Sequence, residues 1–479
     1  MFIKKVSKRL TLLTALTLVL TLLLLACGDA TSTTAPAATT AAATTVANVT
    51  TAVATTAATT AASATTAAAT TAAATTGSTV PGFSVVNTKV AATLKTGPGV
   101  DQATRTIKVG ALFPLSGPVG PYGKIQLAAV ETYFKALNEA GGIGGYKVEV
   151  VSGDTAYQPQ QAVQQYNKIA PDVAMFSVIL GTPIVQALKD QITSEKIIAG
   201  ASTFDSSILF EKYVYIQATP YPIEAINGID FAVRQLNGKS KKFALVYQDD
   251  GYGADAIKGY NTAIKAYGLT DVGQLPFKVG DATFTAQATQ LKNNGAEIVL
   301  LASQPSETAK IIGAASQLGV NAKYLLMSPA FTSSLLATPV KDVLVADSYF
   351  VSKGTSWGDP NVPGWAPMLS ALAKYVPDQK PSNWYSFGWI QAIITANILA
   401  KALEQGDISR DGLFKALESS KNIDLAGLLP NASYGSTPDE RIPSRETTVF
   451  RLDTAAPDGT VVVDKSFASD LAKSFKLGS

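Results

Sequence analysis

The clearest structural pattern in this chain is the stretch from Ile107 to Asp154, which reads IKVGALFPLSGPVGPYGKIQLAAVETYFKALNEAGGIGGYKVEVVSGD. It starts with alternating apolar residues, as a strand does, and a run of prolines and glycines then interrupts that pattern. Apolar residues at helical spacing follow from Gly123 to Ala140, and a second apolar strand begins at Lys147. The order strand, loop, helix, strand predicts a parallel sheet with right-handed helical crossovers.

The loop between the first strand and the helix, residues 116–123, is the first place to look for a ligand, because open parallel sheets bind ligands where strand ends meet loops. Its glycines Gly117, Gly120 and Gly123, with Asp154 after the next strand, have a weak similarity to a dinucleotide site. The spacing is GxxGxxG rather than GxGxxG, and Asp154 lies beyond the usual separation of about 20 residues. This alternative is therefore disfavoured.

The amino terminus has the organisation of a secretory signal. Residues 1–26 contain a basic start and then an apolar run from Leu10 to Leu25 that threonines interrupt. The run ends in Leu-Leu-Ala-Cys-Gly, which resembles a bacterial lipobox, and Cys27 is the only cysteine of the chain. We therefore expect cleavage after Ala26 and lipidation of Cys27.

Residues 27–103 are expected to form a disordered tether after the lipidated cysteine. From Ala30 to Thr79 the chain is almost purely threonine, alanine and serine, which lack the large side chains needed to offset the entropy of ordering. Without the four basic residues of the signal segment, the balance is 35 basic to 36 acidic residues, a net charge of −1. The sequence contains no stripe of basic residues, so it does not indicate a nucleic-acid partner.

The second half of the chain repeats the opening pattern. Residues 242–255 again read as a strand, a loop and the start of a helix, and a tyrosine-glycine pair opens the helix in both halves, at Tyr122-Gly123 and Tyr252-Gly253. This repetition predicts two similar lobes. Asp249-Asp250 lacks the alternating acidic spacing of a calcium loop, so we expect it to cap the helix rather than bind metal.

Four segments together resemble a known family: LSGPVGPYG, NEAGGIGG, KVEVVSGD and QPQQAVQQ. They are similar to the amino-terminal part of the Leu/Ile/Val-binding type of periplasmic binding protein, the solute-capturing subunit of ABC importers, and the resemblance extends from about Thr104 to the carboxyl end. It implies an α/β fold of two doubly wound parallel-sheet lobes joined by a three-crossover hinge. Lobe one would hold residues 104–219 and 347–445, and lobe two residues 220–346 and 446–479.

Two expected strand ends bring small hydroxyl-bearing loops to one edge of the first sheet, at Gly181-Thr182 and at residues 201–203. Hydroxyls, backbone N–H groups and a helix start can hold an anion, although the pattern alone favours cap and turn roles for these residues. The resemblance assigns carboxylate binding to Thr182, Ala201 and Thr203. With neighbouring and opposite-lobe positions, it implies a site of Tyr122, Gly181, Thr182, Ala201, Ser202, Thr203, Tyr252, Gln304 and Phe331.

Two positions depart from the family's pattern. Gln304 stands where a tyrosine is common, and Ala330 stands where an acid would pair with the ammonium of an amino acid. Burying an unpaired ammonium is costly. The resemblance therefore implies an amino-acid-like, amide or carboxylate solute, with Phe331 and Trp384 as an apolar wall.

The chain contains no histidine, which excludes Ser-His-Asp and Cys-His nucleophilic systems and imidazole metal sites. The lack of histidine does not exclude a glycosidase, which can work with two carboxylates, but no sequence pattern identifies one. We expect no enzyme activity, no cofactor and no metal. The expected protein is a monomeric, lipid-anchored, extracytoplasmic solute-binding protein whose partners are an ABC permease and its ATPase. The alternative is a ligand-sensing receptor ectodomain on the same fold.

Overall fold

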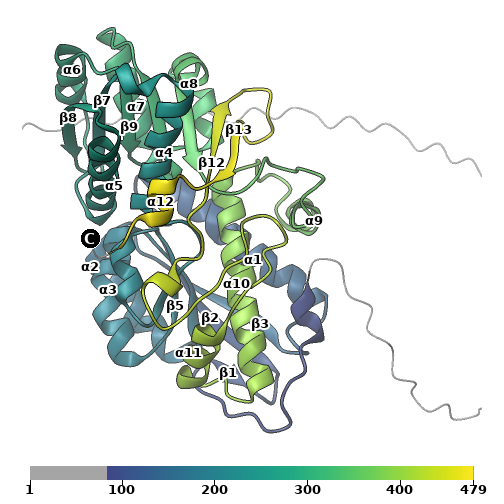
Figure 1. Ribbon diagram of the computed structural model, residues 1–479. Coiled ribbons are helices and arrows are strands. Elements are labelled where there is room, and N and C mark those ends of the chain that lie inside the picture. The colour runs from purple at the N-terminus through teal and green to yellow at the C-terminus, as the bar shows by residue number, and fades with distance from the viewer. Residues whose placement is uncertain (1–82, 478–479) are drawn as a thin grey trace, which may run out of the picture. The chain divides into compact units, whose positions relative to one another are not determined.

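Two sheets organise residues 83–477, which are the part of the chain that this computed structural model describes (Figure 1). The expected signal segment, Cys27 and most of the expected tether lie outside the described residues. The first sheet consists of β1 (Val100–Asp101), β2 (Thr106–Phe113), β3 (Lys147–Asp154), β4 (Met175–Leu180), β5 (Ala199–Ser202) and β6 (Val214–Ile216).

The first sheet is parallel except at β1. Its order is β3-β2-β4-β5-β6, and β1 pairs antiparallel with the start of β2. All residues of β4 are buried, as expected for a central strand that helices cover on both faces. The covering helices are α1 (Gly120–Glu139), α2 (Pro159–Ile169), α3 (Thr182–Glu195) and α10 (Asn383–Gln405), and α11 (Arg410–Ser419) packs on α10.

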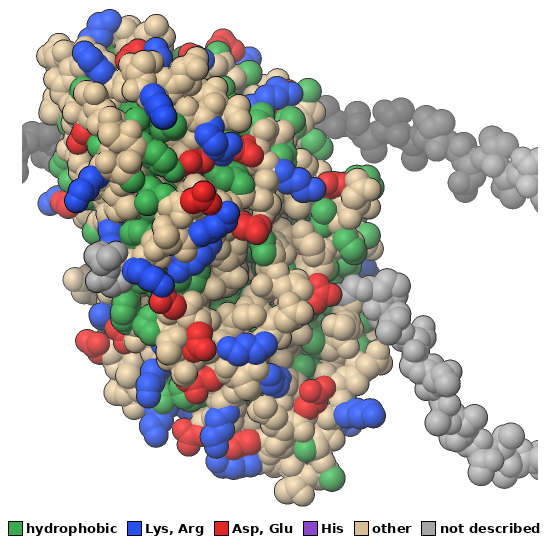
Figure 2. Space-filling model, in the orientation of Figure 1, with side chains coloured by type: hydrophobic (Ala, Val, Ile, Leu, Met, Phe, Trp, Pro, Cys, Tyr) green, Lys and Arg blue, Asp and Glu red, His purple; other side chains and the backbone are tan. Residues whose placement is uncertain are grey.

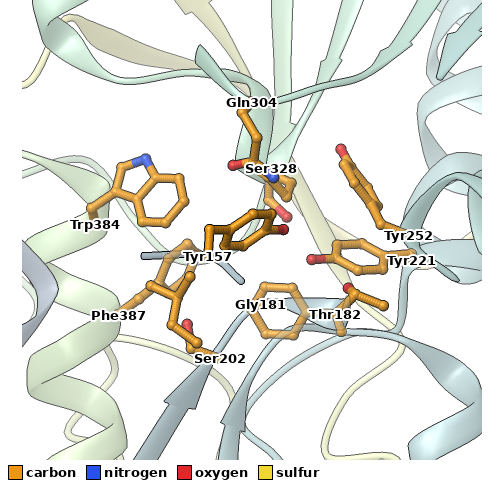
Figure 3. Close-up of a pocket in the computed structure, with 13 residues that line it drawn as sticks. Tyr157, Gly181, Thr182, Ser202, Tyr221, Tyr252, Gln304, Ser328, Trp384 and Phe387 are labelled. Atoms are coloured by element: carbon orange, nitrogen blue, oxygen red, sulfur yellow. The ribbon is translucent and has the colours of Figure 1, made fainter. Parts of the chain in front are cut away.

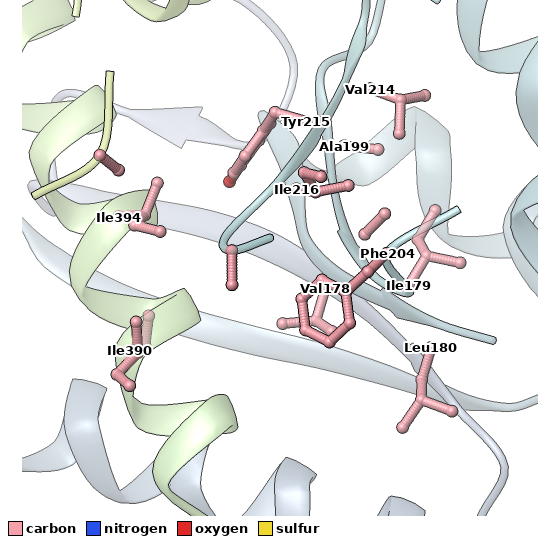
Figure 4. Packing of buried hydrophobic residues seen from close by; sticks show 14 of the residues in the cluster. Val178, Ile179, Leu180, Ala199, Phe204, Val214, Tyr215, Ile216, Ile390 and Ile394 are labelled. Atoms are coloured by element: carbon pink, nitrogen blue, oxygen red, sulfur yellow. The ribbon is translucent and has the colours of Figure 1, made fainter. Parts of the chain in front are cut away.

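Helix α10 comes from the far end of the sequence and packs on the first sheet. Figure 4 shows its Ile390 and Ile394 facing the apolar side chains of β4 to β6. Among the described residues it is the one helix long and apolar enough to cross a membrane, but 78% of that apolar window is buried inside the protein. Its apolar composition is therefore explained by its place in the core.

The second sheet has the order β13-β12-β11-β10-β9-β7-β8. Its strands are β7 (Lys242–Gln248), β8 (Thr270–Phe277), β9 (Ile298–Ala302), β10 (Lys323–Met327), β11 (Ser348–Ser352), β12 (Thr447–Leu452) and β13 (Thr460–Phe467). The strands from β7 to β11 are parallel, whereas β12 and β13 are antiparallel to their neighbours. The helices around this sheet are α4 (Tyr221–Gln235), α5 (Gly251–Tyr267), α6 (Thr285–Asn294), α7 (Pro305–Gln317), α8 (Lys341–Asp347) and α12 (Asp470–Ser474). Helix α9 (Trp365–Tyr375) packs on α1 of the first lobe.

The two α/β lobes that the repeated pattern predicts are therefore present. In the structure, α5 begins at Gly251 with Asp250 as its cap, whose carboxylate accepts from the amides of Tyr252 and Gly253. Asp250 has the predicted capping role. Helix α1 starts at Gly120, three residues earlier than the apolar spacing indicates, because proline is well tolerated in the first turn of a helix.

One expected boundary differs from the structure. The sequence-based division returns the chain to lobe one at residue 347, but β11 (Ser348–Ser352) pairs with β10 on one side and β12 on the other. The strand therefore belongs to the second sheet, and the chain leaves that sheet after Ser352. Its buried, apolar residues would suit either sheet, so the sequence pattern alone could not distinguish them.

The expected tether also ends earlier than predicted. Phe83 is buried, and its ring lies 5.4 Å from Tyr133 and 6.3 Å from Trp389. The amide of Ala91 donates to Leu403, and β1 adds to the first sheet. Residues 83–103 are thus part of the folded first lobe and not of a free linker.

The chain crosses between the sheets three times, and hydrogen bonds hold the crossovers together. The first follows β6, the second follows β11 and the third precedes β12. Thr219 of the first crossover donates to the carbonyl of Glu446, and Thr448 donates to the carbonyl of Gly354 at 2.8 Å. These bonds join three segments that are distant in sequence into one hinge region.

Charged side chains of both signs are interspersed over the face of the molecule shown in Figure 2. The large hydrophobic side chains that are exposed within residues 83–477 are Phe210, Leu318, Val345 and Val463. They come from separate elements, and single exposed hydrophobic residues of this kind are normal on soluble surfaces.

Candidate functional site

A cavity of about 30 Å³ lies between the two lobes, where the carboxyl ends of both sheets face each other (Figure 3). On this scale about 10–15 Å³ holds one water molecule, so the cavity has room for only two or three. We call it the interlobe cavity, and its lining residues are Tyr157, Leu180, Gly181, Thr182, Ser202, Phe204, Tyr221, Tyr252, Gln304, Ser328, Pro329, Trp384 and Phe387.

The wall of the interlobe cavity is aromatic and carries no charged side chain among the described residues. The rings of Tyr221 and Tyr252 lie 4.4 Å apart, and Phe204 contacts Tyr221 at 5.6 Å and Phe387 at 5.8 Å. Trp384 closes another side of the cavity. Such a wall favours a solute with an apolar body and few charges.

The first lobe contributes small polar groups at the start of α3. Gly181 precedes the helix with φ +108 and ψ 134, a conformation that essentially only glycine adopts. The hydroxyls of Thr182 and Thr203 hydrogen-bond to each other at 2.6 Å, and Ser202 pairs with the side chain of Gln126. The start of a 14-residue helix beside these hydroxyls favours a negative charge on a ligand.

Two buried polar atoms of the cavity wall have no hydrogen-bond partner within residues 83–477: the hydroxyl of Tyr252 and Oε1 of Gln304. Gln304 uses its amide nitrogen for a long 3.5 Å bond to Gln248. Burial raises the pKa of Tyr252 well above its usual value, so its hydroxyl stays protonated and can donate. Buried polar groups are normally satisfied, so both atoms are candidates for contacts with a solute.

A buried ion pair lies behind the wall. The Lys353 ammonium donates to the Glu224 carboxylate and, at 2.9 Å, to the Ser328 hydroxyl. The same ammonium lies 3.7 Å from the centre of the Phe204 ring, whose other contacts face the cavity. Burial lowers the pKa of Lys353, and the attraction of Glu224 opposes that shift. The charges are thus paired with each other and separated from the cavity by neutral residues.

The structure brings together five of the nine residues that the sequence singled out. Those that line the interlobe cavity are Gly181, Thr182, Ser202, Tyr252 and Gln304. Thr203 follows the lining residue Ser202 in the chain, and its hydroxyl hydrogen-bonds to that of Thr182, which lines the cavity. Tyr122 lies behind Trp384, with ring centroids 5.4 Å apart.

The remaining two positions do not line the cavity. Ala201 is fully buried within β5. Phe331 was expected to supply an apolar wall, but its ring packs against Phe350 in the core of the second lobe. Only its carbonyl turns toward the site, where it accepts a 3.1 Å bond from the indole of Trp384. Apolar composition alone cannot tell a core ring from a wall ring.

Several lining residues were not among those that the sequence indicated, among them Tyr157, Phe204 and Tyr221. Each lies shortly after the end of a first-sheet strand: Tyr157 after β3, Phe204 after β5 and Tyr221 after β6. Aromatic residues just beyond strand ends were therefore a signal for candidates, although it also selects core rings such as Phe331. Among residues 83–477 no three histidine, cysteine, aspartate or glutamate side chains gather closely enough to hold a metal ion.

Comparisons with known proteins agree with this geometry. The model of the family described as "Periplasmic binding protein" matches residues 106–459. A solved structure of a fatty acid ABC transporter substrate-binding protein from Thermomonospora curvata is similar at 30% identity and a TM-score of 0.75, over 80% of this chain and 97% of that one. A branched-chain amino acid ABC transporter structure from Thermus thermophilus with bound valine shares the fold at a TM-score of 0.68 and 19% identity, over 77% of this chain and 98% of that one.

Curated relatives are similar over shorter stretches. Leu/Ile/Val-binding protein homolog 3 of Brucella melitensis is 30% identical over 205 residues, which cover 42% of this chain and 55% of that protein. The chain thus spans little more than half the length of that relative. Because the family model covers well over half of the present chain, and because the two-lobed fold with an interlobe cavity agrees with it, this protein belongs to the periplasmic binding protein family and is similar to its Leu/Ile/Val-binding type.

Proposed function

We propose that this protein captures a small solute in the interlobe cavity, by binding alone, and delivers it to the permease of an ABC importer on the outer side of the cell membrane. The observation that carries the proposal is the cavity itself, which has a neutral wall and two buried polar atoms without partners, on Tyr252 and Gln304. Membership of a solute-binding family supports it.

The solute that suits the wall has one carboxylate or amide group and an apolar body. Thr182, Ser202 and the start of α3 offer hydroxyls and a favourable helix dipole for a carboxylate or an amide oxygen. The aromatic side of the cavity, with Trp384 and Phe387, suits an apolar body. The similar protein of Thermomonospora curvata is named for fatty acid transport, which agrees with a monocarboxylate solute.

An ordinary α-amino acid fits the wall less well. No aspartate or glutamate is among the described lining residues, and Ala330, where the resemblance implies an acid, is buried outside the cavity. An ammonium group without a carboxylate partner would pay a large desolvation cost. Gln304 instead offers an uncharged acceptor, which suits an amide N–H.

A thermal-shift screen of residues 80–479 tests this function. The panel contains leucine, valine, butyrate, hexanoate, hexanamide and urea. A specific solute stabilises only the folded protein, by about 2.7 kcal/mol at a hundred times its dissociation constant. We expect hexanoate or hexanamide to raise the melting temperature more than leucine does. A larger shift with leucine or valine would overturn the proposed solute class.

A double variant tests the site. Thr182→Ala with Thr203→Ala removes the paired hydroxyls, and the shift caused by the best solute should then disappear. The matched control is Thr262→Ala with Thr338→Ala, because both of these hydroxyls bond only to backbone carbonyls away from the cavity. A shift that survives in the site variant would show that the solute binds elsewhere.

We further propose that the lobes close on the solute by moving about the three crossovers. The division we propose is residues 104–219 and 353–445 for lobe one, with 83–103 added to it, and residues 220–352 and 446–479 for lobe two. Solution scattering with and without the stabilising solute checks this. A radius of gyration that does not change with solute would argue against closure.

We also propose that Cys27 is lipidated and anchors the protein to the membrane, and that the tether which follows it ends before residue 83. A single acyl chain binds membranes only marginally, so stable anchoring needs a multiply acylated cysteine. Cys27→Ser should release the protein from the membrane fraction of cells. Retention of this variant with membranes would remove the lipoprotein interpretation.

A further inference from the structure

We propose that Tyr157 determines which solutes fit, because its ring fills the centre of the interlobe cavity and must move aside or stack on the solute. This inference rests on the proposed solute-binding function and adds a specificity-determining residue to it. Figure 3 shows the ring in the middle of the cavity, between Trp384 on one side and Tyr252 on the other.

The backbone that carries this ring is held in an unusual conformation. Ala156 and Tyr157 have φ values of 47 and 59, so two successive non-glycine residues are left-handed, a conformation that is strained for residues with a side chain. The Asp154 carboxylate accepts from the Ala156 amide at 2.8 Å, and the Thr155 hydroxyl accepts from the Tyr157 amide at 3.3 Å. The turn is therefore imposed by its surroundings.

The same aspartate fixes the turn to the neighbouring loop. Asp154 also accepts from the Leu115 amide at 2.8 Å and from the Ser116 hydroxyl at 2.7 Å. The loop after β3 and the loop after β2 thus share one carboxylate. Backbone strain that several bonds maintain is typical of functional positions, and here it points a large ring into the cavity.

The ring makes contacts with both lobes. On the first lobe it packs so closely on Gly181 that a β-carbon there would lie 2.5 Å from Cε2 of Tyr157. On the second lobe, the Gln248 side chain lies close enough to its hydroxyl to oppose part of the rise in the pKa of Tyr157. Burial raises the pKa of Tyr157, with a further contribution from the Asp250 carboxylate, so the hydroxyl stays protonated. Tyr157 therefore bridges the lobes through the cavity.

The size of the cavity follows from this placement. With the ring in place the free volume is about 30 Å³, which holds two or three water molecules and no solute with several carbon atoms. A solute can enter only if the phenol group turns away or becomes part of the wall. The group that limits the length of the solute is then Tyr157, rather than the hydroxyls of the first lobe.

The first experiment fills the space that the ring leaves. In Tyr157→Ala, 5 mM phenol should raise the melting temperature by several degrees, because phenol replaces the missing group. It should leave the wild type and Tyr213→Ala unchanged. Tyr213 is a matched control: it is also half-buried, but its ring packs on Phe414 outside the cavity. Equal shifts in all three proteins would overturn the claim that the ring fills the cavity.

The second experiment measures selectivity with propionate, hexanoate and decanoate by calorimetry. Tyr157→Ala should change the ratio of the decanoate to the propionate dissociation constant at least tenfold in favour of decanoate. Tyr157→Phe, which keeps the ring, should leave this ratio close to that of the wild type. If the alanine variant changes all three affinities by one common factor, the ring has only a structural role and the proposal is wrong.

The two experiments separate the two proposals. If the wild type binds none of these acids or their amides, the proposed solute class fails, and the phenol result still decides whether Tyr157 fills the cavity. If the wild type binds hexanoate but the alanine variant keeps the same chain-length preference, the solute class stands and the role of Tyr157 is refuted.

Discussion

The hydroxyl of Ser206, in the first lobe, donates a 2.7 Å hydrogen bond to the carboxylate of Asp255 on α5 of the second lobe, and the Ser206 amide donates to the same group. Asp255 is buried by this contact. Burial raises its pKa to about 7, the carboxylate of Asp205 adds to the rise, and the Ser206 bonds and Lys258 oppose it. A titratable group thus lies in the contact between the lobes.

This contact predicts pH-dependent solute binding. In an open protein Asp255 would be exposed, with a pKa near its ordinary 3.8, so closure takes up a proton between pH 4 and 7. Protonation of Asp255 therefore stabilises the closed form fully below about pH 4, and this stabilisation is lost as the pH rises to 7. Solute affinity, measured by calorimetry, should therefore fall by up to about tenfold per pH unit in this window and level off above it.

The variant Asp255→Asn should flatten this pH dependence, because an amide accepts the Ser206 amide bond without titrating. Asp411→Asn, a change at an exposed carboxylate of α11, should keep the wild-type profile. If Asp255→Asn and the wild type show parallel profiles between pH 4 and 7, another group controls closure.

The buried pair of Lys353 and Glu224 predicts a large effect on stability. Lys353→Met leaves the Glu224 carboxylate buried with only the Ser328 amide and hydroxyl as partners, which should lower the free energy of unfolding by about 3–5 kcal/mol. Urea denaturation measures this. Lys374→Met, which breaks an exposed pair with Glu139, should leave it nearly unchanged.

The double variant Lys353→Met with Glu224→Gln should recover part of this loss, because no buried charge then stays unpaired. Losses that simply add in the double variant would mean that the two groups act independently, contrary to their contact.

The packing of Phe83 predicts that residues 83–103 are needed for stability. Phe83→Ala leaves a hole beside Tyr133 and Trp389 and should lower the free energy of unfolding by about 3 kcal/mol. A chain that begins at residue 104 should melt at a lower temperature than one that begins at residue 80. Equal melting temperatures would mean that residues 83–103 add nothing to the fold and belong to the tether, as the sequence predicted.

The repeated glycines predict parallel effects in the two lobes. A β-carbon at Gly123 would lie 1.9 Å from the carbonyl oxygen of Pro114, and one at Gly253 would lie 1.9 Å from that of Gln248. Gly123→Ala and Gly253→Ala should each destabilise the protein by about 1–3 kcal/mol, because backbone must move. Gly313→Ala is the control, since its nearest neighbour is a valine methyl group at 3.5 Å. A loss below 1 kcal/mol in both variants would contradict the close approach.

The sequence by itself indicated two similar lobes of alternating strands and helices and the repeated start of α1 and α5. These features follow from local periodicity and from turn residues, which act within a few positions of each other. It also indicated Gly181 and Thr182 as the point where a strand ends and a helix begins, whereas their role in binding, like that of Tyr252, was implied only by the resemblance to the family. The capping role of Asp250 was predicted on the same basis.

Only the tertiary structure decided which aromatic rings face the solute and which fill the core. Phe331 and Tyr157 both follow strand ends, yet Phe331 packs on Phe350 while Tyr157 enters the cavity. The placement of β11 in the second sheet and of Phe83 in the first lobe likewise depends on partners far away in the sequence. Local patterns report whether a residue is apolar, but only contacts between distant segments determine what it is buried against.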